Sequence, residues 1–146
     1  MKITMEEDPQ LKEAEVLVRC PPGDPEAGRI LAALTAAAPE VLTGWREGQA
    51  YRLNPRDVLY GEAVDGRTFL YTAGAVYETP LRLYELERDL AGRGFLRASK
   101  STVVNFEAVR SLRPDLGGRI RLTMEGGEAV YVSRQYAPVI KKKLGI

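Results

Sequence analysis

The sequence contains no histidine and only one cysteine among its 146 residues. The absence of histidine excludes imidazole acid–base catalysis, histidine metal ligands and phosphohistidine chemistry. Cys20 alone cannot form an internal disulfide or a thiolate-rich zinc site. No spaced acidic loop suits Mg²⁺ or Ca²⁺, and no nucleophile–base pair, paired-carboxylate motif or glycine-rich phosphate loop stands out. We therefore expect no enzyme activity, no cofactor, no metal and no small-molecule substrate.

Long hydrophobic runs are also missing. No apolar run approaches the roughly 18–20 residues that cross a bilayer. The first nine residues, MKITMEEDP, lack the hydrophobic core of a signal peptide. Together with the single cysteine, which suits a reducing compartment, these absences predict a cytoplasmic protein. The length fits one ordinary domain with a small appendage.

Charge is unevenly distributed along the chain. The net charge is only +1, but residues 97–146 hold ten Lys and Arg against four Asp and Glu, a net of +6. Residues 1–96 hold eleven basic and sixteen acidic residues, a net of −5. A basic second half beside an acidic first half indicates an anionic partner for the second half, and DNA is the partner we expect.

Residues 1–43 are predicted to form a small acidic ββα extension, with eight acidic and four basic residues. Two short strands are expected within residues 1–21. Asp24 has the character of an N-cap and Pro25 that of a first helical residue, and the helix should end near Ala38. Such a unit is too small for a core of its own. Two interpretations stay open: it packs on the main domain, or its acidic surface docks a partner or modulates DNA binding.

Residues 44–146 carry the signals of a mainly β (α+β) domain. Strand-like runs flank Glu47-Gly48 and Asp65-Gly66, and such dipeptides predict tight hairpins. Two further turns are predicted at Gly117-Gly118 and Gly126-Gly127. Two short helices complete the prediction, over residues 81–90 and 135–144, with Ser133 as the N-cap of the second.

Three ordered motifs resemble the LytTR family of bacterial DNA-binding domains. They are the segments Asp57–Glu62, Gly94–Asn105 and Val130–Tyr136, and the resemblance covers about two thirds of the chain, from Arg52 to the end. It implies an elongated antiparallel β-sheet domain of about ten short strands. It also implies that loops in successive major grooves read double-stranded DNA, commonly tandem direct repeats in promoters.

The front of the chain departs from many members of that family, which carry a receiver domain. About 45 residues precede the predicted domain, too few for a receiver fold. The chain is thus similar to small stand-alone members, whose genes often lie beside a small membrane protein that restrains them. The resemblance therefore implies a response-regulator-like bacterial protein, with that membrane protein as one partner and a homodimer as one assembly.

The resemblance also implies which loop residues contact DNA. It places a contact at Arg67, or at Thr68 if the register differs by one residue, and others at Lys100 and Arg134. Arginine can grip guanine O6 and N7 with two donors, and lysine can reach the same acceptors. At the start of a helix, Arg134 would oppose the macrodipole, which an anionic partner would explain.

Further residues could hold the phosphate backbone. Short hydroxyl donors and basic side chains of this kind suit phosphate oxygens, and they occur at Ser99, Ser101, Ser133, Arg97, Lys141 and Lys142. The alternatives are a hairpin-tip charge for Arg67, a solvated loop charge for Lys100, a surface salt bridge for Arg134 and a solvated helix face for Lys141 and Lys142. A protein-interaction module with weak DNA binding is the competing function. Single-strand or RNA binding fits less well, because the basic loops lack interleaved aromatics.

Overall fold

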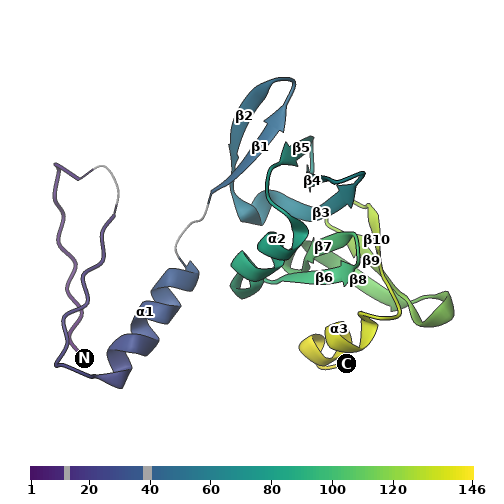
Figure 1. Cartoon of the computed structure of the whole chain (residues 1–146). Helices are drawn as coiled ribbons and strands as arrows, with labels where there is room; N and C mark the ends of the chain where they lie inside the picture. The colour runs from purple at the N-terminus through teal and green to yellow at the C-terminus, as the bar shows by residue number, and fades with distance from the viewer. Residues whose placement is uncertain (12–13, 38–40) are drawn as a thin grey trace. The chain divides into compact units, whose positions relative to one another are not determined.

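The computed structural model describes residues 1–11, 14–37 and 41–146. The chain divides into two units, Met1–Ala38 and Pro39–Ile146 (Figure 1). Within the described residues, no helix is both long enough and apolar enough to cross a membrane.

The first unit contains one helix, α1 (Pro25–Ala37). The Asp24 side chain accepts a hydrogen bond from the Glu26 backbone N–H at 3.0 Å, which confirms the predicted start. Ala38, the predicted end, lies outside the described residues. The prediction of two strands in residues 1–21 is wrong for the described part of that segment, which contains none. Leu17 is 82% exposed there, and a lone two-stranded ribbon without a covering layer is marginal in water.

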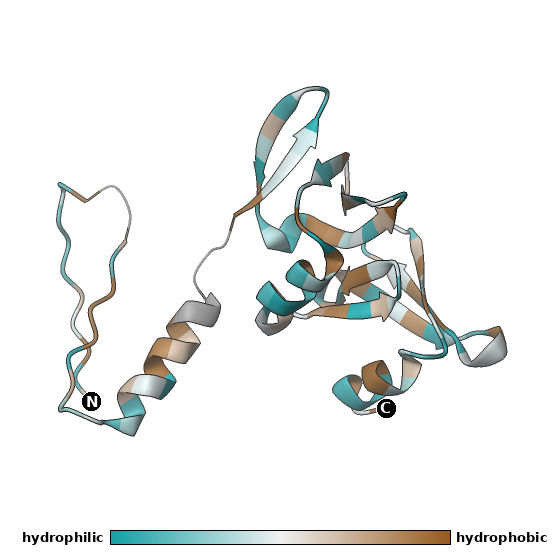
Figure 2. Cartoon of the chain, viewed as in Figure 1, coloured by the Kyte–Doolittle hydropathy of each residue, from teal (hydrophilic) through white to brown (hydrophobic). Residues whose placement is uncertain are grey.

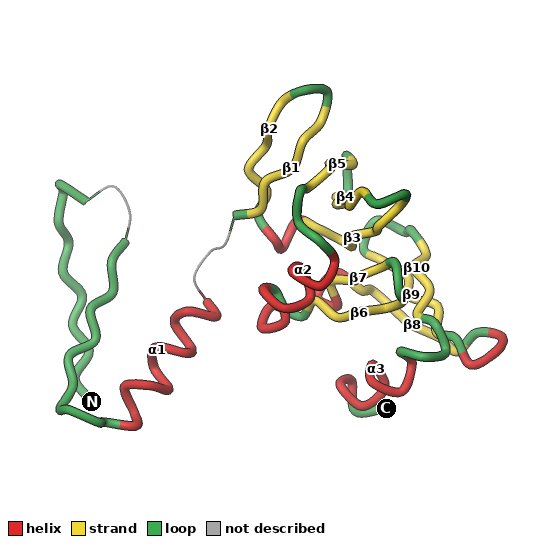
Figure 3. The backbone as a smooth tube through the Cα atoms, viewed as in Figure 1, coloured by secondary structure: helices red, strands yellow, loops and turns green. Residues whose placement is uncertain are grey.

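The second unit is built on two antiparallel sheets (Figure 3). The larger sheet has the order β2-β1-β5-β4-β3-β7-β6 and the smaller one β10-β9-β8. The strands of the larger sheet are β1 (Leu42–Arg46), β2 (Gln49–Leu53), β3 (Val58–Val64), β4 (Arg67–Thr72), β5 (Val76–Thr79), β6 (Phe95–Ser99) and β7 (Thr102–Asn105). Those of the smaller sheet are β8 (Val109–Pro114), β9 (Ile120–Met124) and β10 (Ala129–Val132). Ten strands with α2 (Leu83–Asp89) and α3 (Ala137–Leu144) confirm the predicted mainly β fold class.

Both predicted hairpin turns have the backbone that their sequences require. Glu47 and Gly48 have φ values of 51° and 76°, and Asp65 and Gly66 have 52° and 76°. Two consecutive residues with positive φ are the mark of a type I′ turn, whose twist matches that of the flanking strands. The turns therefore fix the β1–β2 and β3–β4 pairings.

Apolar and polar residues are interleaved along the strands and helices of this unit (Figure 2), and the buried apolar ones form two clusters. One cluster lies between the smaller sheet, α3 and the β6–β7 end of the larger sheet, with Leu122, Val132 and Ile140 fully buried. The other lies where α2 covers the larger sheet, around Leu70 and Leu86. Strands β6 and β7 contribute to both clusters, so these strands join the two sheets.

The last helix begins later than predicted. Tyr136 is the N-cap residue of α3, and the Ser133 carbonyl accepts hydrogen bonds from the backbone N–H groups of Tyr136 and Ala137. Ser133 therefore does not cap the helix with its side chain, and that prediction is wrong. Pro138 fits the first helical turn, where no N–H is needed, which favours the later start. Arg134 consequently lies in the preceding turn, and the macrodipole argument does not apply to it.

Candidate nucleic-acid interface

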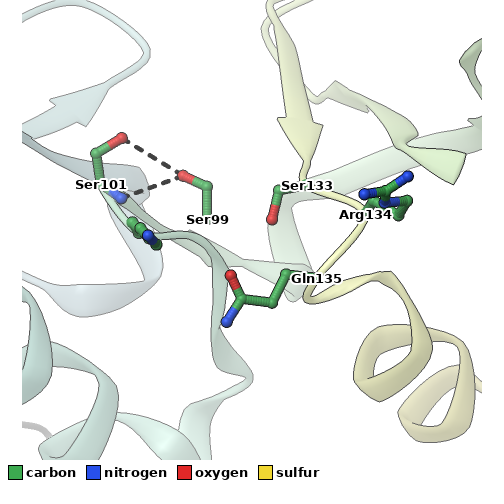
Figure 4. A pocket seen from close by; sticks show the side chains of 6 residues that line it. Ser99, Ser101, Ser133, Arg134 and Gln135 are labelled. Carbon is green, nitrogen blue, oxygen red and sulfur yellow. Dashed lines mark hydrogen bonds between the residues drawn. The ribbon is translucent and has the colours of Figure 1, made fainter. Parts of the chain in front are cut away.

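Two polar loops from distant parts of the chain lie together on the second unit. One is the Ser99–Ser101 turn between β6 and β7, and the other is the Ser133–Gln135 turn after β10. The Ser133 backbone N–H donates to the Ala98 carbonyl at 2.8 Å and ties the end of β10 to β6. The loops surround an open depression of about 560 Å³ lined by Ser99, Lys100, Ser101, Ser133, Arg134 and Gln135 (Figure 4).

The Ser99–Ser101 turn is held by hydrogen bonds on each side. The Ser101 N–H donates to the Ser99 hydroxyl oxygen at 3.3 Å, and the two hydroxyls lie 3.5 Å apart. The Ser101 carbonyl accepts from the Ala63 N–H at 2.8 Å. These bonds fix the backbone of the loop while its Lys100 side chain stays exposed.

Arg97 stabilises the Ser99–Ser101 turn through hydrogen bonds. Its Nη1 donates to the Lys100 carbonyl at 2.8 Å, and its Nε donates to Glu87 Oε2 at 3.0 Å. Only 17% of the Arg97 side chain is exposed. Arg97 therefore positions Lys100 rather than offering its own charge to a ligand.

Arg134 rests on the turn between β8 and β9. A Cβ atom on Gly118 would lie 3.0 Å from Arg134 Cγ, and Gly118 has a φ of 80° that favours glycine. Close contact with this bare backbone supports the stem of Arg134 and leaves the residue exposed. Within the described residues, neither Arg134 nor Lys100 forms an ion pair with an acidic side chain.

Gln135 is a lining residue that the sequence analysis missed. Figure 4 shows its amide reaching towards the Ser99–Ser101 loop, whereas Arg134 points the other way. The sequence feature that points to Gln135 is its position directly after Ser133-Arg134 in the same turn. Glutamine can pair with both N6 and N7 of adenine, so this side chain belongs among the candidate base contacts.

Two predicted contacts at the β3–β4 hairpin lie away from this depression. Arg67 forms a two-armed ion pair with Glu78, at 2.8 and 2.7 Å, and its guanidinium lies 5.6 Å from the centre of the Phe69 ring. The hydrogen bond from Arg67 lowers the pKa of the Glu78 carboxyl. Thr68 is only 5% exposed, because alternation along β4 turns it inwards with Leu70. We therefore leave Thr68 out of the contact surface.

Lys141 and Lys142 are exposed in the last turn of α3 and do not line the depression. That location suits the negative end of the helix dipole. Their charge is available to a distant phosphate, but no contact in the described residues directs either side chain towards the two loops.

The second unit is a mainly β domain. Its loops place basic, hydroxyl and amide side chains around an open surface. This arrangement fits a class of proteins that bind an anionic polymer through loops. Residues 48–145 match the family model of the LytTr DNA-binding domain. The chain belongs to this family. The resemblance proposed from the three motifs is thereby confirmed.

Relatives and a solved structure agree with that assignment. The chain is 31% identical over 105 residues to an uncharacterized HTH-type transcriptional regulator of Staphylococcus aureus strain NCTC 8325, a match over 72% of this chain and 71% of the relative. A regulator of the same description from strain MRSA252 is 30% identical over 105 residues, again covering 72% of this chain and 71% of the relative. The LytTr DNA-binding domain of a Bacillus cereus methyl-accepting/DNA response regulator superposes with a TM-score of 0.71 and 28% identity, over 75% of this chain and 100% of that domain.

Proposed function

We propose that this protein is a sequence-specific transcriptional regulator that reads promoter DNA in the major groove through loop side chains. The observation that carries the proposal is the meeting of the Lys100 and Arg134 loops around one open depression. Both side chains are exposed and without acidic partners in the described part of the chain. Strands separate the described α-helices from one another, which supports contacts made by loops rather than by a pair of helices.

The residues around the depression divide into two roles. Arg134 and Lys100 reach for guanine O6 and N7, and Gln135 for adenine N6 and N7. Ser99, Ser101 and Ser133 donate hydroxyl hydrogen bonds to phosphate oxygens, which fix the register of the protein on the duplex. The charge of Arg67 is already paired with Glu78, so its contribution at a neighbouring groove is secondary.

The proposed arrangement of targets rests on the family resemblance. We propose that two copies bind tandem direct repeats in a promoter, each copy using the same loops, and that this occurs in the cytoplasm. A small membrane protein remains our candidate for a regulator of the chain. The acidic segment of this chain, residues 1–43, is the proposed docking region for that membrane protein.

Binding to DNA is tested by fluorescence anisotropy of the full chain, with the duplex upstream of its own gene and a scrambled duplex of equal length. A specific regulator should prefer the native duplex by about 10³-fold or more. A salt series gives the number of phosphate contacts, because the slope of log affinity against log salt concentration is about −0.9 for each contact. Equal, weak affinity for the two duplexes would contradict sequence-specific regulation and favour the interaction module.

Replacement of Arg97 by alanine should weaken specific binding by about tenfold, which corresponds to roughly 1.4 kcal/mol, although Arg97 does not reach the DNA. The reason is that the Lys100 carbonyl loses its donor and the loop loses its order. Anisotropy with the native duplex measures the loss. A matched Arg88→Ala variant removes an exposed arginine whose ion pair, among the described residues, is with its neighbour Asp89, and it should bind like the wild type. Equal affinities for the two variants would contradict the bracing role.

A further inference from the structure

The smaller sheet has one buried face and one basic face. On β9, the residues Ile120, Leu122 and Met124 are buried at 2%, 0% and 0% exposure. Arg121 and Thr123 alternate with them and therefore lie on the opposite face. Within the described residues, neither apolar cluster includes Arg121 or Thr123, so core packing does not account for the basic residues on this second face.

Two arginines stand directly opposite each other on this face. The register pairs Arg113 of β8 with Arg121 of β9, and Arg121 with Tyr131 of β10. Like charges in such positions destabilise a sheet. Among the described residues, neither arginine has an acidic partner, and the Nε of Arg121 is buried without a hydrogen-bond partner. The free protein therefore carries an electrostatic cost here that an anion would relieve.

The basic face continues to the candidate interface. The Arg119 guanidinium lies 5.0 Å from the centre of the Tyr131 ring and donates to Asp115 Oδ2 at 2.8 Å. Arg119 directly follows Gly118, where an added Cβ would lie 3.0 Å from Arg134 Cγ. A line of basic side chains thus runs from Arg134, past Arg119 and Tyr131, to the pair Arg121 and Arg113.

We propose that this arginine strip, Arg113, Arg119 and Arg121, binds the phosphate backbone of the DNA that flanks the bases read at the depression. The inference rests on the proposed function and adds a second contact surface to it. Guanidinium forks match phosphate oxygens in geometry and charge. A strip continuous with Arg134 fits an extended polyanion, whereas a single free phosphate would occupy only part of it.

Replacement of Arg113 by glutamate tests the strip, because it should lower the affinity for DNA without lowering the stability of the fold. An opposite-charge pair with Arg121 should leave the midpoint of thermal unfolding unchanged or raised. Affinity for DNA should fall by about tenfold, equally for the native and the scrambled duplex. The log–log salt slope should become shallower by about 0.9 or more. The control is Arg52→Glu, which makes the same charge change at an exposed residue of β2 outside the strip.

The outcomes distinguish a failure of the arginine-strip inference from a failure of the proposed function. If Arg113→Glu loses no more affinity and no more slope than Arg52→Glu, the strip does not bind the backbone and the inference is wrong. If the wild type prefers neither duplex, specific regulation fails, but the two variants still report on the strip through sequence-independent binding. Arg113→Gln, which removes one charge without adding another, should show a smaller loss in the same direction.

Discussion

Arg134→Ala is expected to remove most of the preference for the native duplex over the scrambled one. Arginine that grips guanine O6 and N7 contributes about 1–3 kcal/mol of discrimination, so the ratio of the two affinities should fall by roughly 5- to 150-fold. Binding to the scrambled duplex should change much less, because it depends on phosphate contacts. Anisotropy with the two duplexes at one fixed salt concentration measures the ratio.

Two further variants serve as the comparison and the control for Arg134→Ala. Arg134→Lys keeps the charge and loses the two-donor fork, so it should recover sequence-independent affinity but only part of the discrimination. Arg56→Ala removes an exposed arginine far along the chain from both loops and should bind like the wild type. Thermal unfolding should be unchanged in each case, because Arg134 is exposed and forms no ion pair among the described residues. An unchanged ratio for Arg134→Ala would overturn its assignment as a base contact.

The second large effect is expected on stability, from Asn105→Ala. Asn105 is 1% exposed, and its side chain amide joins two segments. Nδ2 donates to the Val58 carbonyl at 3.0 Å, and Oδ1 accepts from the Glu107 N–H at 3.1 Å. Alanine leaves both backbone groups without these partners, so the free energy of unfolding should fall by about 2–4 kcal/mol. Urea denaturation followed by circular dichroism measures the change.

Asn54→Ala is the matched control for that variant. Both asparagines accept a hydrogen bond from the residue two positions on and precede a 3-10 turn, but the Asn54 bond to the Arg56 N–H is exposed. We expect Asn54→Ala to cost about 0.5–1 kcal/mol, since water replaces the lost partner. The difference between the two losses reports the bond from Asn105 Nδ2 to the Val58 carbonyl, which is the long-range contact of this side chain. Similar losses for Asn54→Ala and Asn105→Ala would show that this bond contributes little.

Local physical chemistry explains what the sequence by itself determined. Two dipeptides, Glu47-Gly48 and Asp65-Gly66, specify turns of positive φ, and the strands beside them must then pair. Asp24 and Pro25 start a helix through interactions within one turn. Asn105 likewise accepts a hydrogen bond from the Glu107 N–H two residues further on, through an interaction within one turn. The mainly β class and the family follow from such local features and from the ordered motifs.

The tertiary structure alone decided which of the expected contact residues share a surface. The bond from the Ser133 N–H to the Ala98 carbonyl brings together loops that are far apart in the chain, and no local pattern encodes that register. Glu78 of the neighbouring strand engages Arg67, Glu87 of α2 engages Arg97, and the fold of β4 buries Thr68. These outcomes depend on strand order and on which face meets the core, which are set by packing between distant segments rather than by the residues beside each side chain.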